Sequence, residues 1–156
     1  INCLLRGKPF YIYGDGEQTR APSYVGDCLG AMALLGLSSN SELIASQTFN
    51  IGALKTYTLN EMARVMCQVY EQVTGKCAPE PLYTEARPLE VRHAYCNNMK
   101  SVRVLGYEDR TTLHEGLRRM VEWAVRVAPN GVAPRYLDEL ELDEKAPIQW
   151  REKLFL

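Results

Sequence analysis

The sequence predicts an α/β protein in which short strands alternate with helices. Three observations indicate this class: short aromatic and β-branched runs beside glycine, apolar residues at helical spacing, and Thr-x-x-Glu patterns ahead of two apolar runs. Hydrophobic residues make up 46% and charged residues 24% of the 156-residue chain, a globular composition that supplies a core. The composition changes after Pro129-Asn130-Gly131, so we expect one domain over residues 1–131 and a tail over residues 132–156.

Strands are expected where aromatic or β-branched runs are bounded by glycine or proline. The first such run is followed by Gly14-Asp15-Gly16, whose surroundings predict a turn from strand to strand rather than from strand to helix. The expected extended segments are residues 8–13, 19–25, 47–51 and 81–84.

Helices are expected where apolar residues recur at helical spacing between a capping residue and a glycine. Thr58 with Glu61, and Thr112 with Glu115, fit capping boxes, in which the hydroxyl and the carboxylate each satisfy a backbone donor. The expected helices are the end of one at residues 1–6, 28–37 with Asp27 in its first turn, 58–75, 97–105, and a last one from residue 112. The last helix places Leu113, Leu117, Met120, Val121 and Ala124 on one face.

Charge and cysteine content exclude several classes of protein. A formal net charge of −1 predicts neither a nucleic-acid partner nor an anionic membrane surface, and no apolar run reaches the length of a membrane span. No signal peptide is recognisable at the start. Five cysteines without a C-x-x-C pair, and two histidines far apart, do not favour a metal site. Buried free thiols in a reducing cytosol are the simplest interpretation, so we expect a cytoplasmic location.

Common cofactor-binding and catalytic motifs are missing from the sequence. A dinucleotide cradle needs G-x-G-x-x-G between a strand and a helix, but Thr19 stands where a third glycine after Gly14 and Gly16 belongs. There is no P-loop, no G-x-S-x-G elbow and no H-E-x-x-H pair. We therefore expect the chain to bind no nucleotide cofactor of its own.

Two segments contain arginines suited to binding a phosphate. Arg20 follows the glycine turn, where the backbone can approach a ligand closely, and Arg87 and Arg92 lie in a proline-marked loop. A solvated Arg20, and surface ion pairs of the other two arginines with Glu85 or Glu90, are the alternative interpretations. Composition and spacing leave both interpretations open.

Two tyrosines and an asparagine are further candidates. Tyr11 and Tyr13 alternate on the first expected strand and so share a face, which suits either stacking on a nucleobase or the protein core. Asn50 lies at the end of the expected strand 47–51, where ligands usually bind in α/β proteins.

Six segments, in this order, carry a resemblance: RGKPFYIYGDGEQTR, SYVGDCLGAMALL, TFNIG, YTLNEMARVM, EARPLEVRHAY and NNMKSVRVLGYEDRTTLHEGLRRMVEWA. They resemble the extended short-chain dehydrogenase/reductase family, which includes the NAD-dependent nucleotide-sugar epimerases and dehydratases. The resemblance covers about residues 1–127 and not the tail. It implies a small mixed α/β substrate-binding domain, the C-terminal portion of a Rossmann-type fold, without the glycine-rich nucleotide-binding half.

The resemblance implies roles for both candidate loops. Arg20 matches the arginine of a G-x-G-x-Q-x-R turn and Arg87 that of an R-P-G-D segment, and both arginines bind the substrate diphosphate in the family. Glu90 stands at the aspartate of the second segment, a position that can bond the nucleotide ribose. Leu89 replaces its glycine, so the shape of this loop departs from the family pattern.

The resemblance also assigns the remaining candidates. Tyr11 and Tyr13 lie in the stretch that flanks the base, and Asn50 matches an asparagine near the substrate. Further departures from the family pattern are Ala21-Pro22, Gly26 and Asn97.

The cofactor loop and the catalytic Y-x-x-x-K pair of the family lie upstream of the matched segments. In the family that tyrosine exchanges a proton with the sugar hydroxyl while NAD takes the hydride. None of the nine tyrosines here is followed by lysine four positions later. Because the first residue is Ile1, we expect a piece of a longer chain whose other half binds NAD, and no catalytic residue in this piece.

The function expected is thus the nucleotide-sugar-binding portion of an NAD-dependent epimerase acting on a UDP-sugar. A nucleotide-sugar 4,6-dehydratase, a UDP-glucuronate decarboxylase and a non-catalytic nucleotide-sugar-binding or assembly module are the alternatives. A lone half-domain would expose the apolar faces that normally pack on its other half, so we also expect a homo-oligomer.

Overall fold

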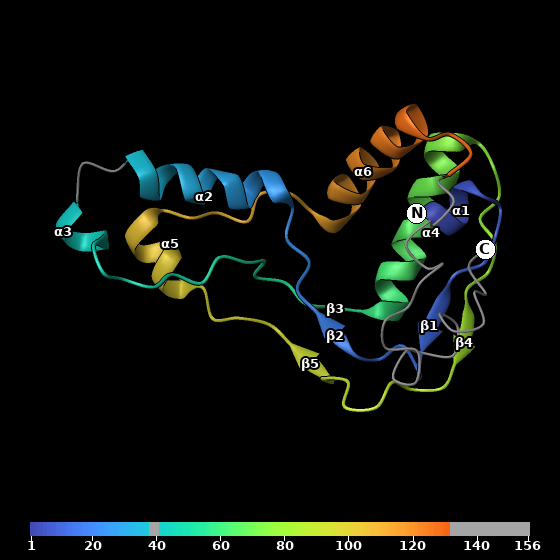
Figure 1. Cartoon of the computed structure of the whole chain (residues 1–156), viewed down its shortest axis with the longest axis horizontal. Coiled ribbons are helices and arrows are strands. Elements are labelled where there is room, and N and C mark those ends of the chain that lie inside the picture. Colours follow the sequence, from blue (N-terminus) through green and yellow to red (C-terminus); the bar gives the residue numbers. More distant parts are fainter. Residues whose placement is uncertain (38–40, 132–156) are drawn as a thin grey trace, which may run out of the picture.

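The computed structural model describes residues 1–37 and 41–131, which form an elongated α/β arrangement with two small sheets (Figure 1). One sheet pairs two parallel strands, and in the other a central strand lies between an antiparallel and a parallel neighbour. The predicted α/β class is confirmed, whereas the expected tail 132–156 lies outside the described residues. The sheets are β1 (Tyr11–Tyr13) with β4 (Leu82–Thr84), and β3 (Tyr57–Thr58), β2 (Thr19–Arg20) and β5 (His93–Ala94) in that order.

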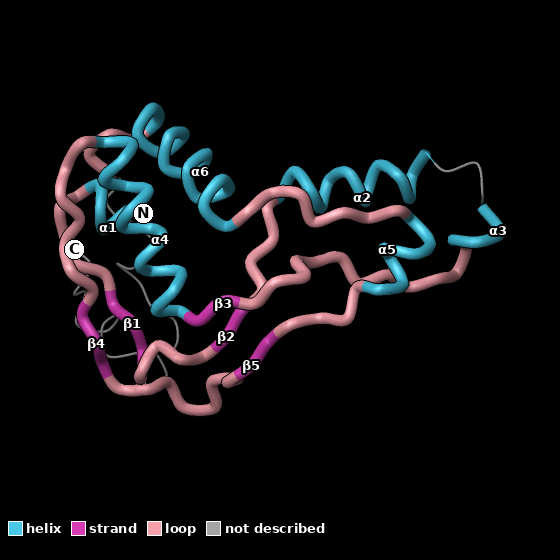
Figure 2. Tube along the Cα trace, turned by 180° about the vertical axis from the view of Figure 1, so that it is seen from behind, coloured by secondary structure: helices cyan, strands magenta, loops and turns pink. Residues whose placement is uncertain are grey.

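Three helices form the core at one end of the molecule. α4 (Leu59–Thr74) packs on α6 (Leu113–Val127), and the short α1 (Asn2–Leu5) lies beside them (Figure 2). Removing this apolar surface from water is the main stabilising contribution here. The buried cluster consists of Leu4, Val69, Tyr70 and Val121.

The two predicted capping boxes have different outcomes. At α4 the box is complete, because Thr58 Oγ1 accepts from Glu61 N at 3.0 Å and the Glu61 carboxylate accepts from Thr58 N at 2.8 Å. At α6 Thr112 Oγ1 accepts from Glu115 N at 3.2 Å, but the Glu115 carboxylate bonds Arg118 and Arg119 instead.

The residues predicted to share one face of α6 are buried to different degrees. Val121 and Ala124 are buried, and Leu113 and Leu117 are half-buried. Met120, predicted to share this face, is 50% exposed. Its position on the helix turns it to the edge of the apolar stripe that faces α4.

An arm of three helices extends away from this core (Figure 1). α2 (Val25–Leu37) packs on α5 (Met99–Leu105), and α3 (Ser41–Ile44) lies at the tip. Asp27 lies in the first turn of α2 as predicted, and its carboxylate accepts from Thr111 N at 2.9 Å.

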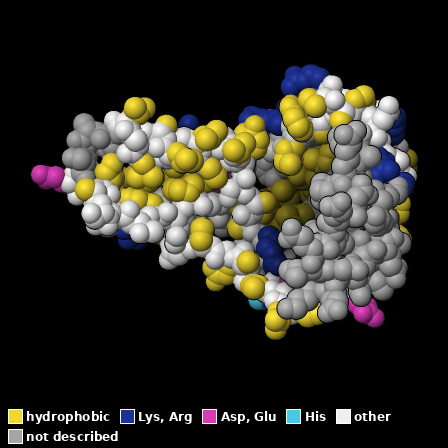
Figure 3. Space-filling view, viewed as in Figure 1, with side chains coloured by type: hydrophobic (Ala, Val, Ile, Leu, Met, Phe, Trp, Pro, Cys, Tyr) yellow, Lys and Arg dark blue, Asp and Glu magenta, His cyan; other side chains and the backbone are white. Residues whose placement is uncertain are grey.

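The arm leaves apolar side chains uncovered, and they gather along it in Figure 3. Ala31 is the only buried residue of α2. A helix that is apolar around most of its circumference normally lies inside a protein, so this one lacks a covering partner within the described residues. Its exposed large side chains are Val25, Leu29, Met32, Leu34 and Leu37.

The prediction of a strand over residues 47–51 is wrong. No strand pairs with this segment in the described part of the chain. Its backbone carbonyls accept hydrogen bonds from side chains of α5 instead. Ser101 donates to Asn50 O at 2.5 Å and Lys100 to Thr48 O at 2.9 Å, and Asn98 donates at 2.7 Å to the carbonyl of Gly52, which follows the segment. Residues with high strand propensity form a β-strand only when a neighbouring strand accepts and donates their backbone hydrogen bonds.

The described residues contain no helix long and apolar enough to cross a bilayer. No group of three metal-ligating side chains is found among them either. All five cysteines are free, but the expectation that they are buried is wrong. Cys77 is exposed and the other four are half-buried. These free thiols are therefore at least partly accessible to solvent.

The turn from β1 to β2 is held by the first turn of α4. Asn60 Nδ2 donates to Asp15 O at 2.9 Å, and Asn60 N donates to Gly16 O at 3.1 Å. Gly16 has φ +75° and lies against the Asn60 side chain, so a β-carbon would meet both strain and a clash. The glycine is required here because the helix approaches the turn so closely.

Gly16→Ala should destabilise the fold by about 1–3 kcal/mol, because of its left-handed backbone and the contact with Asn60. Gly30→Ala is the matched control, since Gly30 lies inside α2 with open space around it and should gain about 0.5–1 kcal/mol. Urea unfolding followed by circular dichroism measures both. Equal effects of the two substitutions would contradict the proposed contact.

Thr58→Ala should cost about 1 kcal/mol of unfolding free energy, because it leaves a backbone donor of α4 without its cap. Thr56→Ala provides the comparison, since Thr56 is exposed two residues earlier and precedes the helix. The midpoint temperature of thermal unfolding should fall for Thr58→Ala only. An equal fall in both variants would refute the capping role.

Candidate functional site

A pocket of about 240 Å³ lies where β1 and β4 end. The two strands pair in parallel, with Tyr13 opposite Thr84, so the segments that follow them start side by side. Gly14 N continues the pairing by donating to Thr84 O at 2.9 Å. Loops after parallel strands are where α/β proteins usually bind ligands. The lining residues are Tyr13, Gly14, Asp15, Gln18, Ala86, Arg87, Glu90 and Arg92.

Arg87 stacks on the ring of Tyr13 in this pocket. Its guanidinium carbon is 3.8 Å from the ring centroid, a cation–π contact that orients the charge without neutralising it. No carboxylate of residues 1–37 or 41–131 forms an ion pair with Arg87. The alternative interpretation, a surface ion pair with Glu85 or Glu90, is therefore wrong for Arg87.

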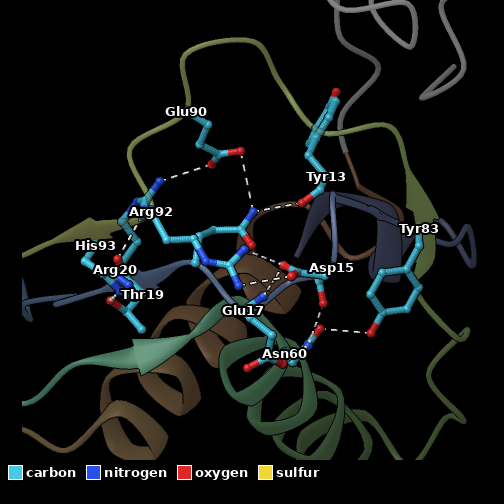
Figure 4. A network of polar contacts seen from close by, with 11 residues as sticks. Tyr13, Asp15, Glu17, Thr19, Arg20, Asn60, Tyr83, Glu90, Arg92 and His93 are labelled. Atoms are coloured by element: carbon cyan, nitrogen blue, oxygen red, sulfur yellow. Dashed lines mark hydrogen bonds and ion pairs between the residues drawn. The ribbon is translucent and has the colours of Figure 1, made fainter.

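Arg20 reaches the same pocket through Glu90. Its Nη2 lies 3.1 Å from Glu90 Oε1, and its Nη1 donates to Thr19 O at 2.8 Å (Figure 4). Arg20 itself does not line the pocket, but its partner does. The two predicted phosphate-binding arginines therefore lie on the same side of the molecule.

Arg92 is paired with Asp15 across the pocket rim. The contact is bidentate, with Nη1 2.8 Å from Oδ1 and Nη2 3.0 Å from Oδ2. The hydrogen bonds from Arg92 hold the pKa of Asp15 below its usual value, with help from the backbone of Glu17. The pairing with Arg92 therefore favours the charged form of Asp15.

Gln18 is a member of the site that the sequence reasoning did not single out. Its side chain is almost wholly buried, and its Nε2 donates to Tyr13 O at 2.8 Å and faces Glu90 Oε2 at 3.5 Å. Both partners are acceptors, which fixes the orientation of the amide. The sequence signal that could have identified Gln18 is the G-x-G-x-Q-x-R pattern, in which Gln18 is the fixed glutamine between the glycine turn and Arg20.

The structure does not bring every predicted residue to this pocket. Tyr11 lies two residues before Tyr13 on β1, half-buried and opposite Leu82, and does not line the pocket. Asn50 lies beside the start of α5, where its Nδ2 donates to Asn97 O at 3.2 Å. The pocket thus unites Tyr13, Arg87 and Glu90, with Arg20 behind Glu90.

The described residues do not fit a dinucleotide cofactor. Such a cofactor needs a glycine-rich turn that opens a helix, so that free backbone N–H groups meet its pyrophosphate. Here Gly14-Asp15-Gly16 joins two strands and packs on Asn60. The cations of the pocket suit an anionic group such as a phosphate or diphosphate instead.

Comparison with known proteins finds relatives of one kind. No family model matches the sequence. The chain is 32% identical over 126 residues to the dTDP-glucose 4,6-dehydratase of Neisseria gonorrhoeae, covering 76% of this chain and 35% of that protein. It resembles the structure of UDP-glucose 4-epimerase from Thermotoga maritima with UDP-glucose, at TM-score 0.67 and 31% identity over 80% of this chain and 37% of the other.

A third similar structure is MoeE5 in complex with UDP-glucose and NAD, with TM-score 0.66 and 32% identity over 80% of this chain and 39% of that one. The chain spans between 35% and 39% of the length of these three relatives. Sequence and structure comparisons agree on the kind of protein across most of the described residues. The chain belongs to the extended short-chain dehydrogenase/reductase family of NAD-dependent nucleotide-sugar epimerases and dehydratases.

Proposed function

We propose that this chain is the substrate-binding, C-terminal portion of an NAD-dependent nucleotide-sugar epimerase or dehydratase. UDP-sugar 4-epimerisation is the parent reaction that we favour, with nucleotide-sugar 4,6-dehydration and UDP-glucuronate decarboxylation as alternatives. The names of the relatives support the general kind of reaction. The observation that carries the proposal is the arrangement of Arg87 and the Arg20–Glu90 pair around a single pocket.

The group held in the pocket is the diphosphate of the nucleotide sugar. Arg87 presents a guanidinium without a carboxylate partner among the described residues, already aligned on Tyr13. Arginine binds phosphate oxygens through two parallel hydrogen bonds, which fix orientation as well as position. A pocket of about 240 Å³ lies below the range usual for drug-sized ligands, so base and sugar must extend beyond it.

The remaining candidate residues keep the roles that the resemblance implies. Glu90 bonds the ribose, and Tyr11 and Tyr13 lie beside the base. Asn50 is assigned to the sugar end of the ligand, away from the diphosphate pocket. Burial of the Tyr13 ring at the pocket wall supports an aromatic contact there.

The parent enzyme uses NAD, which supplies hydride transfer when bound. The part of the longer relatives that this chain does not match would bind the cofactor, because the described residues offer no cradle for it. Without a Tyr-x-x-x-Lys pair, this chain contributes binding and orientation of the substrate. Correct positioning of a substrate beside its reacting partner is itself a large part of catalysis.

A non-catalytic nucleotide-sugar-binding or assembly module is the second candidate. The uncovered apolar surface of α2 favours it, since such surfaces mark contacts between proteins. As an isolated chain, the protein would form a homo-oligomer through this helix. The free thiols support our proposal of a cytoplasmic location.

Arg87→Ala should weaken UDP binding at least tenfold, because it removes a charge-assisted contact to phosphate. Arg20→Ala should weaken it as well. Arg103→Ala is the control, since Arg103 is exposed on α5 and does not line the pocket. Isothermal titration measures all four proteins, including the wild type. Wild-type affinity in Arg87→Ala would refute the diphosphate assignment.

Sedimentation velocity should find dimers or larger species of the isolated chain at high concentration, because α2 has no cover among the described residues. Met32→Glu should shift the distribution toward monomer, since Met32 is 63% exposed on that helix. Met120→Glu on α6 supplies a matched change at a 50% exposed methionine and should have little effect. A wild-type chain that stays monomeric throughout would rule out the contact.

A further inference from the structure

We propose that Glu90 acts as an internal competitor for the diphosphate, holding Arg20 until the ligand displaces it. This inference rests on the proposed function and deepens it. It concerns the unliganded protein, in which the Glu90 carboxylate occupies the donors that a phosphate oxygen would take. It adds Gln18 to the residues that contact the anion.

The contacts of Glu90 are those expected of a bound anion. One carboxylate oxygen lies 3.1 Å from Arg20 Nη2, and the other lies 3.5 Å from Gln18 Nε2. The side chains of Arg20 and Glu90 are only 30% and 22% exposed, so the pair is partly shielded from water. A carboxylate and a phosphate present similar oxygen pairs to a guanidinium, and one can therefore replace the other.

The donors stay in place when the acceptor leaves. Gln18 Nε2 also donates to Tyr13 O at 2.8 Å, and Arg20 Nη1 donates to Thr19 O at 2.8 Å. Each side chain is thus anchored by the backbone through a bond that does not involve Glu90. Preorganised donors cost little further ordering when a new anion arrives.

The loop that carries Glu90 is suited to releasing it. Leu89, the preceding residue, has φ +60°, a left-handed conformation that disfavours a side chain. Its side chain is fully exposed, so no packing holds it in that conformation. Glu90 N is 3.4 Å from Arg87 O, a long bond for a turn. Moving the Glu90 carboxylate away from Arg20 therefore breaks little besides the ion pair.

The charges around the pocket give this displacement a clear effect. Arg20 is neutralised by Glu90 and Arg92 by Asp15, which leaves Arg87 as the cation without a carboxylate partner in the described residues. A diphosphate bound by Arg87 alone would face the negative Glu90. Once Glu90 moves, the ligand gains Arg20 and loses the repulsion.

Glu90→Gln tests the competition, because it removes the charge that holds Arg20 but retains an oxygen that can accept from a ribose hydroxyl. We expect it to bind UDP and inorganic pyrophosphate about fivefold more tightly than the control, which corresponds to the loss of one partly shielded ion pair. Glu85→Gln is that control, since it removes the same charge from an exposed position on the same loop. Isothermal titration gives the affinities.

The double variant Arg20→Ala/Glu90→Gln separates direct competition from general charge. Without Arg20, the change at Glu90 should alter affinity no more than Glu85→Gln does. The inference is overturned if Glu90→Gln binds no tighter than the control, if only UDP and not pyrophosphate gains, or if the gain persists without Arg20. No saturable UDP binding in the wild type and in Glu90→Gln would overturn the proposed function itself, and this inference with it.

Discussion

The close packing of the Gly14–Gly16 turn on Asn60 is the constraint on which the site depends. One asparagine at the start of α4 bonds Asp15 O and Glu17 Oε1 through its nitrogen and accepts from the Tyr83 hydroxyl at 2.9 Å through its oxygen. It therefore joins the turn after β1 to strand β4. A single helix end, well capped, fixes both walls of the pocket relative to the helical core.

The charged groups of the pocket are largely paired with one another, whereas the Tyr13 hydroxyl and the Gln18 carbonyl oxygen are buried without a hydrogen-bond partner among the described residues. Two arginines are paired with acids that approach from opposite loops, and the third is stacked on a tyrosine. Such pairing keeps three cations close together without strong mutual repulsion. It also means that affinity for an anion depends on which of these pairs can open, and not only on how many arginines are present.

The arm leaves part of the chain without cover among the described residues. α2 is apolar around most of its circumference yet buries a single residue, and residues 47–51 have no strand partner in the part of the chain that the structure describes. Apolar helices and strands are normally covered by or paired with other elements, and within the described residues α2 is largely uncovered and residues 47–51 are unpaired.

The sequence by itself determined the α/β class, the positions of the main helices and the complete cap at Thr58, because these depend on neighbours a few residues apart. It also indicated the two arginine-bearing loops, through local pattern and family resemblance. Only the tertiary structure decided that Arg20 pairs with Glu90, seventy residues away, that Arg87 stacks on Tyr13, and that Gln18 belongs to the site. Those contacts join segments whose distance in space is set by strand pairing and helix packing, which local sequence does not encode.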